Sequence, residues 1–253
     1  MNRSPLIWRR ALRALIATVA SLTLLVGAAC DARKSEPAAL PKTNEVSSAP
    51  VVVSPLPNLT NAPPSPTAPR TPNELFQAAQ KLAKGTGDTR DPAAAARLYA
   101  EAAGKGHVDA QAYLAAAYRT GAGVVKNPTE AARWFRAAAE QGDARSQGVL
   151  ASMYGTGEGV AKDPVEAVKW YRRAAEQGQV RAQANLGALL FLGQGVPKDP
   201  VEAYKWLHLA AQKGDQEAVK NRGNVAARLS VAQMNEGRKR AAEFVTDKTK
   251  LVP

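Results

Sequence analysis

The chain has 253 residues, of which 34 are Lys or Arg and 22 are Asp or Glu, so its formal net charge is +12. Such a charge favours acidic partners or a membrane surface, although in an exported protein it mainly aids solubility. No aromatic and basic binding motif accompanies the charge, so we expect no nucleic-acid partner. The single cysteine excludes an intramolecular disulfide, so helix packing must hold the folded part together.

The first 29 residues have the composition of an export signal. Four Arg and no acidic residue lie within residues 1–13, and an apolar run from Ala14 to Ala29 follows. This run is short for a membrane span, which needs about 20 residues. We therefore expect residues 1–29 to be a signal peptide.

The apolar run ends in Gly27-Ala28-Ala29-Cys30, which resembles the lipobox of bacterial lipoproteins. The resemblance implies cleavage before Cys30 and lipidation of that cysteine, although Gly27 stands where lipoproteins usually have an aliphatic residue. The same small residues also suit ordinary signal peptidase, which would leave a soluble periplasmic or secreted protein. In the lipoprotein interpretation, Asp31 resembles a signal for retention in the inner membrane.

Residues 30–72 form a Pro-rich segment without a periodic apolar face. Ten Pro fall in the 42 positions from 31 to 72. Such a composition cannot bury enough apolar surface to offset the entropy lost on folding. We expect a disordered, lipid-anchored linker that reaches roughly 35 Å as a coil and roughly 130 Å when fully extended.

A 36-residue period runs through residues 73–219. Tryptophans and glycines keep this spacing at Trp134, Trp170, Trp206, Gly142, Gly178 and Gly214. An earlier copy is degenerate and has Leu98 at the Trp position. Periods of about 20 to 50 residues indicate stacked supersecondary units. We expect four units, at 76–111, 112–147, 148–183 and 184–219.

Each unit is expected to contain two helices joined by a Gly-rich turn. In the first helix, apolar residues recur four positions apart, as Leu150 and Tyr154 do, so they share one face. The second helix begins at an Asp-Pro or Asn-Pro pair, in which the first side chain caps free N–H groups. Its apolar stripe combines small Ala with a large aromatic side chain. The Gly-x-Gly-Val turn recurs in three copies, so we interpret it as architecture rather than as a phosphate-binding loop.

These recurring residues resemble the Sel-one-like repeat, a relative of the tetratricopeptide repeat, over about residues 76–219. The first copy departs from the pattern at Ala78, Asp88 and Leu98, as a terminal capping unit does. The resemblance implies an all-α fold, a right-handed α/α superhelix of about four helix-turn-helix repeats. It also implies an adaptor in a protein complex, often in a bacterial envelope. Some cysteine-rich exported relatives are reported to bind or hydrolyse β-lactams.

After Ala218 the period fails, and we expect residues 220–253 to form a C-terminal capping helix and a tail. Ser230 and Gln233 have the spacing of a capping box, which predicts a helix over 231–245. Its expected inner side carries Met234, Ala241, Phe244 and Val245, and its outer side carries Arg238, Lys239 and Arg240.

No catalytic motif occurs in the repeats. The sequence lacks a nucleophile-elbow Ser, a His-Glu-x-x-His pair and a Ser-x-x-Lys pattern there, and the recurring acids are helix caps. We expect His107 and His208 at the surface. We therefore expect no enzyme, cofactor, metal or small-molecule substrate. The alternatives are an enzyme acting on β-lactams or peptidoglycan, and direct binding to the cell wall.

The predicted function is a membrane-tethered periplasmic scaffold that binds envelope proteins along a groove lined by its first helices. Signalling, secretion and polysaccharide export all stay open as pathways. Core positions recur between copies, so specificity should lie where copies differ. These positions are Tyr113, Arg119, Arg145, Arg181, Asn185 and Phe191. Burial against the C-terminal helix is a second interpretation of Phe191.

Overall fold

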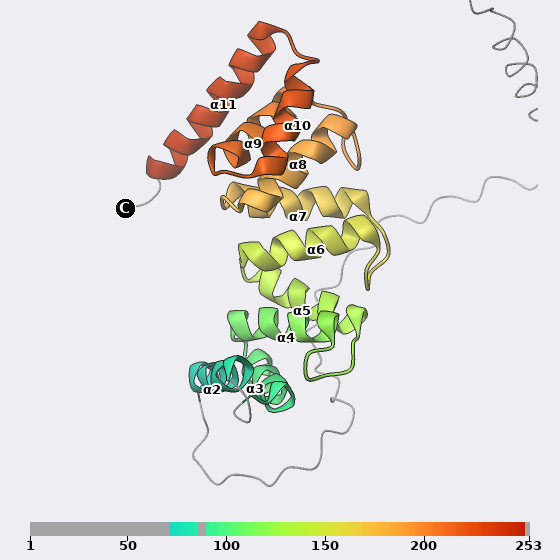
Figure 1. Ribbon diagram of the computed structural model, residues 1–253, viewed down its shortest axis with the longest axis vertical. Coiled ribbons are helices and arrows are strands. Elements are labelled where there is room, and N and C mark those ends of the chain that lie inside the picture. Colours follow the sequence, from blue (N-terminus) through green and yellow to red (C-terminus); the bar gives the residue numbers. More distant parts are fainter. Residues whose placement is uncertain (1–70, 86–89, 251–253) are drawn as a thin grey trace, which may run out of the picture. The chain divides into compact units, whose positions relative to one another are not determined.

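The computed structural model describes residues 71–85 and 90–250, and these residues form ten helices and no strand. The helices are α2 (Pro72–Lys84), α3 (Pro92–Gly104), α4 (Val108–Thr120), α5 (Pro128–Glu140), α6 (Ala144–Thr156), α7 (Pro164–Glu176), α8 (Val180–Leu192), α9 (Pro200–Gln212), α10 (Gln216–Ala226) and α11 (Val231–Lys250). From α2 to α10 they stack in chain order (Figure 1). The all-α repeat superhelix is confirmed. The predicted signal peptide, Cys30 and the linker up to residue 70 lie outside the described residues.

Each unit pairs a first helix with a second one, as α4 pairs with α5, and the second helix then packs on the first helix of the next unit. The first helices begin four residues before the predicted unit boundaries at 112, 148 and 184. The shift follows from their caps, because each cap side chain accepts a hydrogen bond from the N–H three residues further on. These caps are His107, Asp143 and Gln179.

The second helices begin as predicted. The carboxylate of Asp163 accepts hydrogen bonds from the N–H groups of Val165 and Glu166, at 2.9 and 3.0 Å. Asp199 caps α9 in the same way, through the N–H of Glu202 at 2.9 Å. The predicted left-handed glycines also follow these helices, for example Gly178 with φ +88°. These caps satisfy donors that each helix would otherwise leave unpaired.

A close contact joins the turn of each unit to the unit before it. The turn between α6 and α7 lies so near the start of α5 that a Cβ on Gly159 would be 2.1 Å from the carbonyl oxygen of Pro128. The same approach recurs at two other joints, Gly123 to Pro92 and Gly195 to Pro164. The repeated turn is therefore a packing joint between units.

Buried glutamines form a second link between units. Gln147 donates from Nε2 to the carbonyl of Ala139 at 3.0 Å, and its Oε1 accepts from Gln177 at 2.7 Å. The preceding unit repeats both bonds with Gln111, Ala103 and Gln141. In the last full unit, Lys213 replaces the outer glutamine and bonds to the carbonyl of Gly178. The Oε1 of Gln183 is therefore buried without a hydrogen-bond partner among the residues that the structure describes.

We expect Lys213→Gln to stabilise the protein by about 1 kcal/mol, because an amide at this position would donate to the unpaired Oε1 of Gln183. Urea unfolding followed by circular dichroism measures the change. Lys105→Gln is the matched control, since Lys105 holds the equivalent position but Leu75 stands where the partner glutamine would be. Equal stability of Lys213→Gln and the wild type would show that the unpaired Gln183 amide oxygen does not weaken this link between units.

Beyond Ala218, where the sequence period was predicted to fail, α10 still stacks on α9 as one more first helix. Asp215 caps it through the N–H of Ala218 at 2.7 Å, and both Ala218 and Val225 are buried. The core weakens there because Arg222 stands at the position of the buried Leu186. A charged residue at this point ends the apolar stripe that a further unit would cover.

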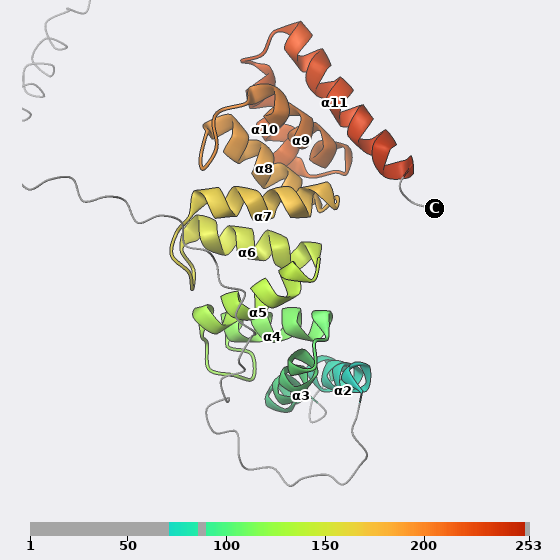
Figure 2. The ribbon, with the colours of Figure 1, turned by 180° about the vertical axis from the view of Figure 1, so that it is seen from behind.

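The last helix, α11, packs along α9 and covers the end of the array (Figure 2). Its capping box is confirmed, because Ser230 and Gln233 exchange backbone-to-side-chain hydrogen bonds at 2.9 and 3.2 Å. The helix runs five residues beyond the predicted 231–245. The Phe244 ring meets that of Trp206 edge on at 5.1 Å, which fixes the inner side of α11.

Two predicted orientations on α11 are wrong. Val245 is 48% exposed rather than on the inner side. Arg240 does not point only into solvent, because it pairs with Glu236 at 2.8 Å and lies 3.6 Å from Glu202 of α9.

No helix within residues 71–85 and 90–250 is both long and apolar enough to cross a membrane.

Candidate interaction surface

All six predicted interaction residues lie on first helices. They are Tyr113 and Arg119 on α4, Arg145 on α6, and Arg181, Asn185 and Phe191 on α8. These six residues, together with Asp109, Val149 and Ser152, are called the first-helix face below. None of the nine is fully buried, whereas the constant residues Leu150 and Trp170 are at most 7% exposed. The array thus separates its constant core from a variable surface.

Tyr113 belongs to an aromatic cluster at the junction of the first two units. Its ring stacks on Tyr99 of α3, with centroids 5.2 Å apart, and meets Phe76 of α2 edge on at 5.7 Å. Burial, and then the charge of Tyr113, raises the pKa of Tyr99 to about 12, so its hydroxyl stays protonated. Tyr113 is nevertheless 38% exposed, so one side of the cluster is accessible. The sequence did not single out Phe76 or Tyr99.

His107 also joins this cluster, contrary to its expected surface position. It is half-buried, its ring stacks on Phe76 at 4.5 Å, and its Nδ1 accepts the N–H of Ala110 at 3.3 Å. The signal was present in the sequence, because His107 stands where Asp143 and Asp215 cap other first helices. Its structural role is therefore that of a helix cap.

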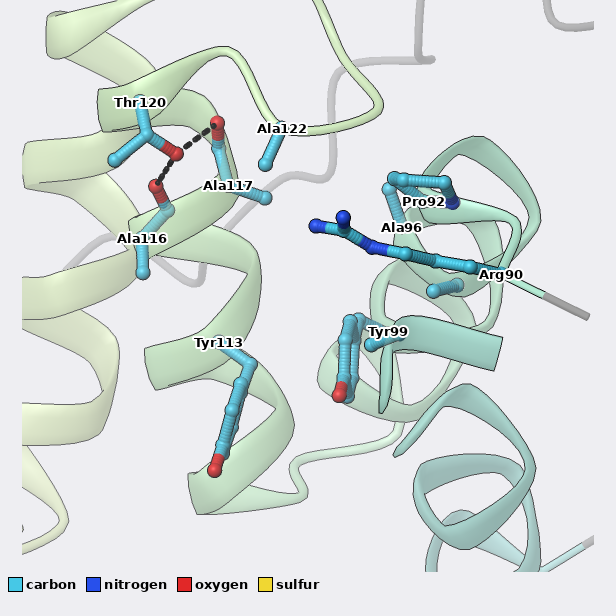
Figure 3. A pocket seen from close by; sticks show the side chains of 11 residues that line it. Arg90, Pro92, Ala96, Tyr99, Tyr113, Ala116, Ala117, Thr120 and Ala122 are labelled. Atoms are coloured by element: carbon cyan, nitrogen blue, oxygen red, sulfur yellow. Dashed lines mark hydrogen bonds between the residues drawn. The ribbon is translucent and has the colours of Figure 1, made fainter. Parts of the chain in front are cut away.

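A pocket of about 190 Å³ opens beside Tyr113, between α3 and α4. Tyr99 and Tyr113 form one side, and small side chains of the two helices form most of the remainder. Arg90, just before α3, extends across the pocket toward Ala117 (Figure 3). The sequence did not predict this pocket.

Arg145 links α6 to α4 through an ion pair. Its Nη2 lies 3.0 Å from Oδ1 of Asp109, and its Nε lies 3.6 Å from Asp143. The Arg145 side chain is 69% exposed, so the pair contributes at most about 1 kcal/mol. The charge of Arg145 is therefore already balanced within the chain.

Arg181 and Asn185 lie near Tyr171 of α7. Ser152 of α6 and Asn185 of α8 both hydrogen-bond to the Tyr171 hydroxyl. Burial raises the pKa of Tyr171, and the two hydrogen bonds and the nearby charge of Arg181 offset only part of this rise. The structure thus brings Arg181, Asn185 and Ser152 of the first-helix face together around one second-helix tyrosine.

Arg119 and Phe191 hold equivalent positions but have different surroundings. Phe191 is half-buried against the core, and the guanidinium of Arg228 lies over its ring at 5.2 Å. This packing against the C-terminal segment corresponds to the second interpretation of Phe191. Arg119 is half-exposed and makes no ion pair within the described residues.

The first-helix face is positively charged. The helices α4, α6 and α8 contain three Arg and a single acidic residue, Asp109, which Arg145 neutralises. Arg119 and Arg181 have no carboxylate within ion-pair distance in the part of the chain that the structure describes. Uncompensated cations on one surface favour an acidic partner.

The described residues contain no cluster of three or more His, Cys, Asp or Glu side chains that could hold a metal. His208 is half-buried between α9 and α10, not at the surface as expected, and its Nδ1 lies 3.2 Å from a guanidinium nitrogen of Arg222. Burial, and then the charges of Arg222 and Arg238, lowers the pKa of His208. His208 therefore has a packing role between the last helices of the array.

Comparison with known proteins identifies the repeat. The Sel1 repeat family matches residues 76–107, 108–143, 144–179 and 180–215. A Sel1 repeat protein from Oxalobacter formigenes is 33% identical, with a TM-score of 0.60 over 66% of this chain and 73% of that chain. No curated protein is significantly similar to this chain in sequence.

Two further solved structures are similar. A protective antigen of uropathogenic Escherichia coli strains that displays an SLR fold is 27% identical, with a TM-score of 0.49 over 70% of this chain and 46% of that chain. Helicobacter pylori cysteine rich protein B is 21% identical, with a TM-score of 0.42 over 54% of this chain and 98% of its own.

Proteins built from Sel1 repeats generally mediate protein–protein interactions and lack catalytic activity. The matched units reach from residue 76 to residue 215, which is more than half of the chain. Their helices are the paired helices α2 to α9 described above. The chain therefore belongs to the Sel1 repeat family.

Proposed function

We propose that this protein is a membrane-tethered scaffold of the bacterial envelope that holds a partner protein on its first-helix face. The observation that carries the proposal is the separation of constant from variable residues. The recurring core residues of the helices are buried, as Leu150 and Trp170 are, whereas the variable Arg181 and Tyr113 are exposed. A surface that differs between otherwise similar units is suited to recognising one partner along its length.

The charge of the first-helix face supports a partner with an acidic surface. Arg119 and Arg181 are accessible and have no ion-pair partner among the described residues, and Tyr113 adds an exposed aromatic ring at one end. Arg and Tyr are enriched among residues that dominate binding energy at protein interfaces. These side chains combine charge steering with an aromatic anchor.

The tether and the location rest on the N-terminal sequence. The basic start, the short apolar run and the small residues before Cys30 support a lipid anchor, and the Pro-rich segment supports a spacer. Asp31 supports retention in the inner membrane. Separation of the two envelope membranes tests this placement, and recovery of the protein in the outer membrane would exclude retention.

Capture of partners from crosslinked envelopes tests the binding surface. We expect Arg181→Ala combined with Asn185→Ala to lower recovery of the partner about tenfold or more, because two contacts that α8 contributes to the face are removed. Lys169→Ala combined with Val165→Ala is the matched control, since both side chains are exposed on the second helix α7. Mass spectrometry of the captured proteins measures recovery.

All variants should keep the helical circular-dichroism signal of the wild type. Equal partner recovery by the first-helix variant and by the wild type would remove the first-helix face as the binding surface. Loss of recovery in the α7 control alone would move the binding surface to the second helices.

A further inference from the structure

The pocket between α3 and α4 lies where the second unit has a smaller side chain than the equivalent positions of the next units. Ala117 lines this pocket, whereas the equivalent positions in the next two units are Met153 and Leu189. Met153 is fully buried and Leu189 is packed against the core, so larger side chains occupy the corresponding space there. The space beside Ala117 is therefore a specific feature of the second unit.

The walls of the pocket are apolar on most sides. Alanines and Pro92 line it together with the rings of Tyr99 and Tyr113 (Figure 3). The Thr120 hydroxyl, at the rim, already donates to the carbonyl of Ala116 at 2.8 Å. Aromatic rings beside small aliphatic groups favour insertion of an apolar side chain.

One polar group in the wall is available to a ligand. Arg90 is exposed and makes no ion pair with any described residue. The Tyr99 hydroxyl has no hydrogen-bond partner among the described residues, but it is buried from solvent and so cannot meet a docked segment. A carboxylate is the group that would pair with the Arg90 guanidinium.

The size of the pocket limits what it can hold. Its volume of about 190 Å³ lies below the roughly 300–1,000 Å³ that is typical of sites for cofactors and drug-sized ligands. One compact side chain, with the backbone of an extended segment along the rim, fits this volume better than a whole small molecule.

We propose that the pocket receives one compact apolar side chain from an extended, acidic segment of the partner protein, and that a neighbouring carboxylate of this segment pairs with Arg90. This inference rests on the proposed function, because it places one anchor of the same partner. Charge complementarity selects this occupant, since Arg90 is followed along the array by the uncompensated Arg119 and Arg181. The pocket sets the register of the segment, and the arginines steer it toward the first-helix face.

Fluorescence-anisotropy titration of the purified full chain with short labelled peptides tests the proposal. The peptides share a central Leu and carry Glu, Gln or Lys on both sides of it. We expect the Glu-flanked peptide to bind about tenfold tighter than the Lys-flanked peptide, and replacement of its central Leu by Gly to weaken binding by a similar factor.

Two variants locate the binding to the pocket. Ala117→Met should fill it with the side chain that the next unit carries, and Arg90→Ala should remove the free cation. Each variant is expected to weaken binding of the Glu-flanked peptide about tenfold. Lys126→Ala is the matched control and should bind as the wild type does, because Lys126 holds the position equivalent to Arg90 one unit further on.

Three results would overturn the proposal. Equal binding of the Glu- and Lys-flanked peptides would exclude the acidic segment, and wild-type affinity in both Ala117→Met and Arg90→Ala would exclude the pocket. If those two variants bind normally while Arg181→Ala weakens binding, the first-helix face still binds protein and only the pocket assignment fails. Tighter binding of a peptide spanning residues 61–70 than of the Glu-flanked peptide would assign the pocket to the chain's own Pro-rich segment.

Discussion

Gly159→Ala should destabilise the protein by about 4 kcal/mol or more, which is in the range of the most damaging single substitutions. A Cβ at this position would lie 2.1 Å from the carbonyl oxygen of Pro128 and 2.3 Å from its carbonyl carbon. Both atoms belong to the backbone at the start of α5, so they cannot move without displacing that helix. Urea unfolding followed by far-ultraviolet circular dichroism measures the loss.

Gly157→Ala is the matched control, because Gly157 lies in the same turn and has a similar φ of +82°, against +72° at Gly159. The nearest atom to a Cβ there would be that of Lys162 at 3.4 Å, so only the left-handed backbone conformation is penalised. That penalty is about 1–2 kcal/mol. The difference between the two variants isolates the contact between units, and equal losses in both would contradict the packing joint.

Trp206→Ala should cost about 3–5 kcal/mol, the loss typical of a fully buried tryptophan. The ring is 2% exposed, meets Phe244 of α11 edge on and lies 4.5 Å from Nζ of Lys205. Its removal leaves a cavity between α9 and α11, so the terminal helix should detach first. Amide hydrogen exchange of α11 measures this local loss of stability. A single unfolding curve would average the loss over all units of the repeat array.

Trp206→Phe is the milder control for this position. A phenyl ring keeps most of the apolar contact with Phe244. It also removes an indole N–H that is buried and has no hydrogen-bond partner in the described part of the chain. We expect less than half of the loss seen with Trp206→Ala. Unchanged exchange protection of α11 in the alanine variant would show that Trp206 does not hold the C-terminal helix.

The fold was predictable because one signal was repeated several times. The 36-residue spacing fixed the pairing of helices, and the capping pair Asp163-Pro164 fixed where a second helix starts. The residue at which each unit begins was harder to predict, because a period shows which positions are equivalent but not where a unit starts. The four-residue shift follows from cap residues as different as His107 and Gln179, whose shared role emerges only from the hydrogen bonds.

The candidate site was only partly predictable for a related reason. Comparison between copies selected Tyr113, Arg181 and Asn185 as variable positions, and the structure places them on exposed or half-exposed sides of first helices. The comparison between copies could not reveal which residues face each other across two helices. The stacking of Tyr99 on Tyr113 and the space beside Ala117 depend on packing between units, which a one-dimensional period does not contain.

Photocrosslinking in intact cells tests whether the first-helix face holds the partner. A photoreactive amino acid at position 113 or 185 of the full chain would report contacts of the first-helix face, and one at position 165 or 169 would report contacts of the second helix α7. We expect one common protein to be crosslinked from positions 113 and 185 and to be absent from positions 165 and 169. Crosslinking of the same protein from α7 alone, or with equal yield from all four positions, would contradict recognition by the first-helix face.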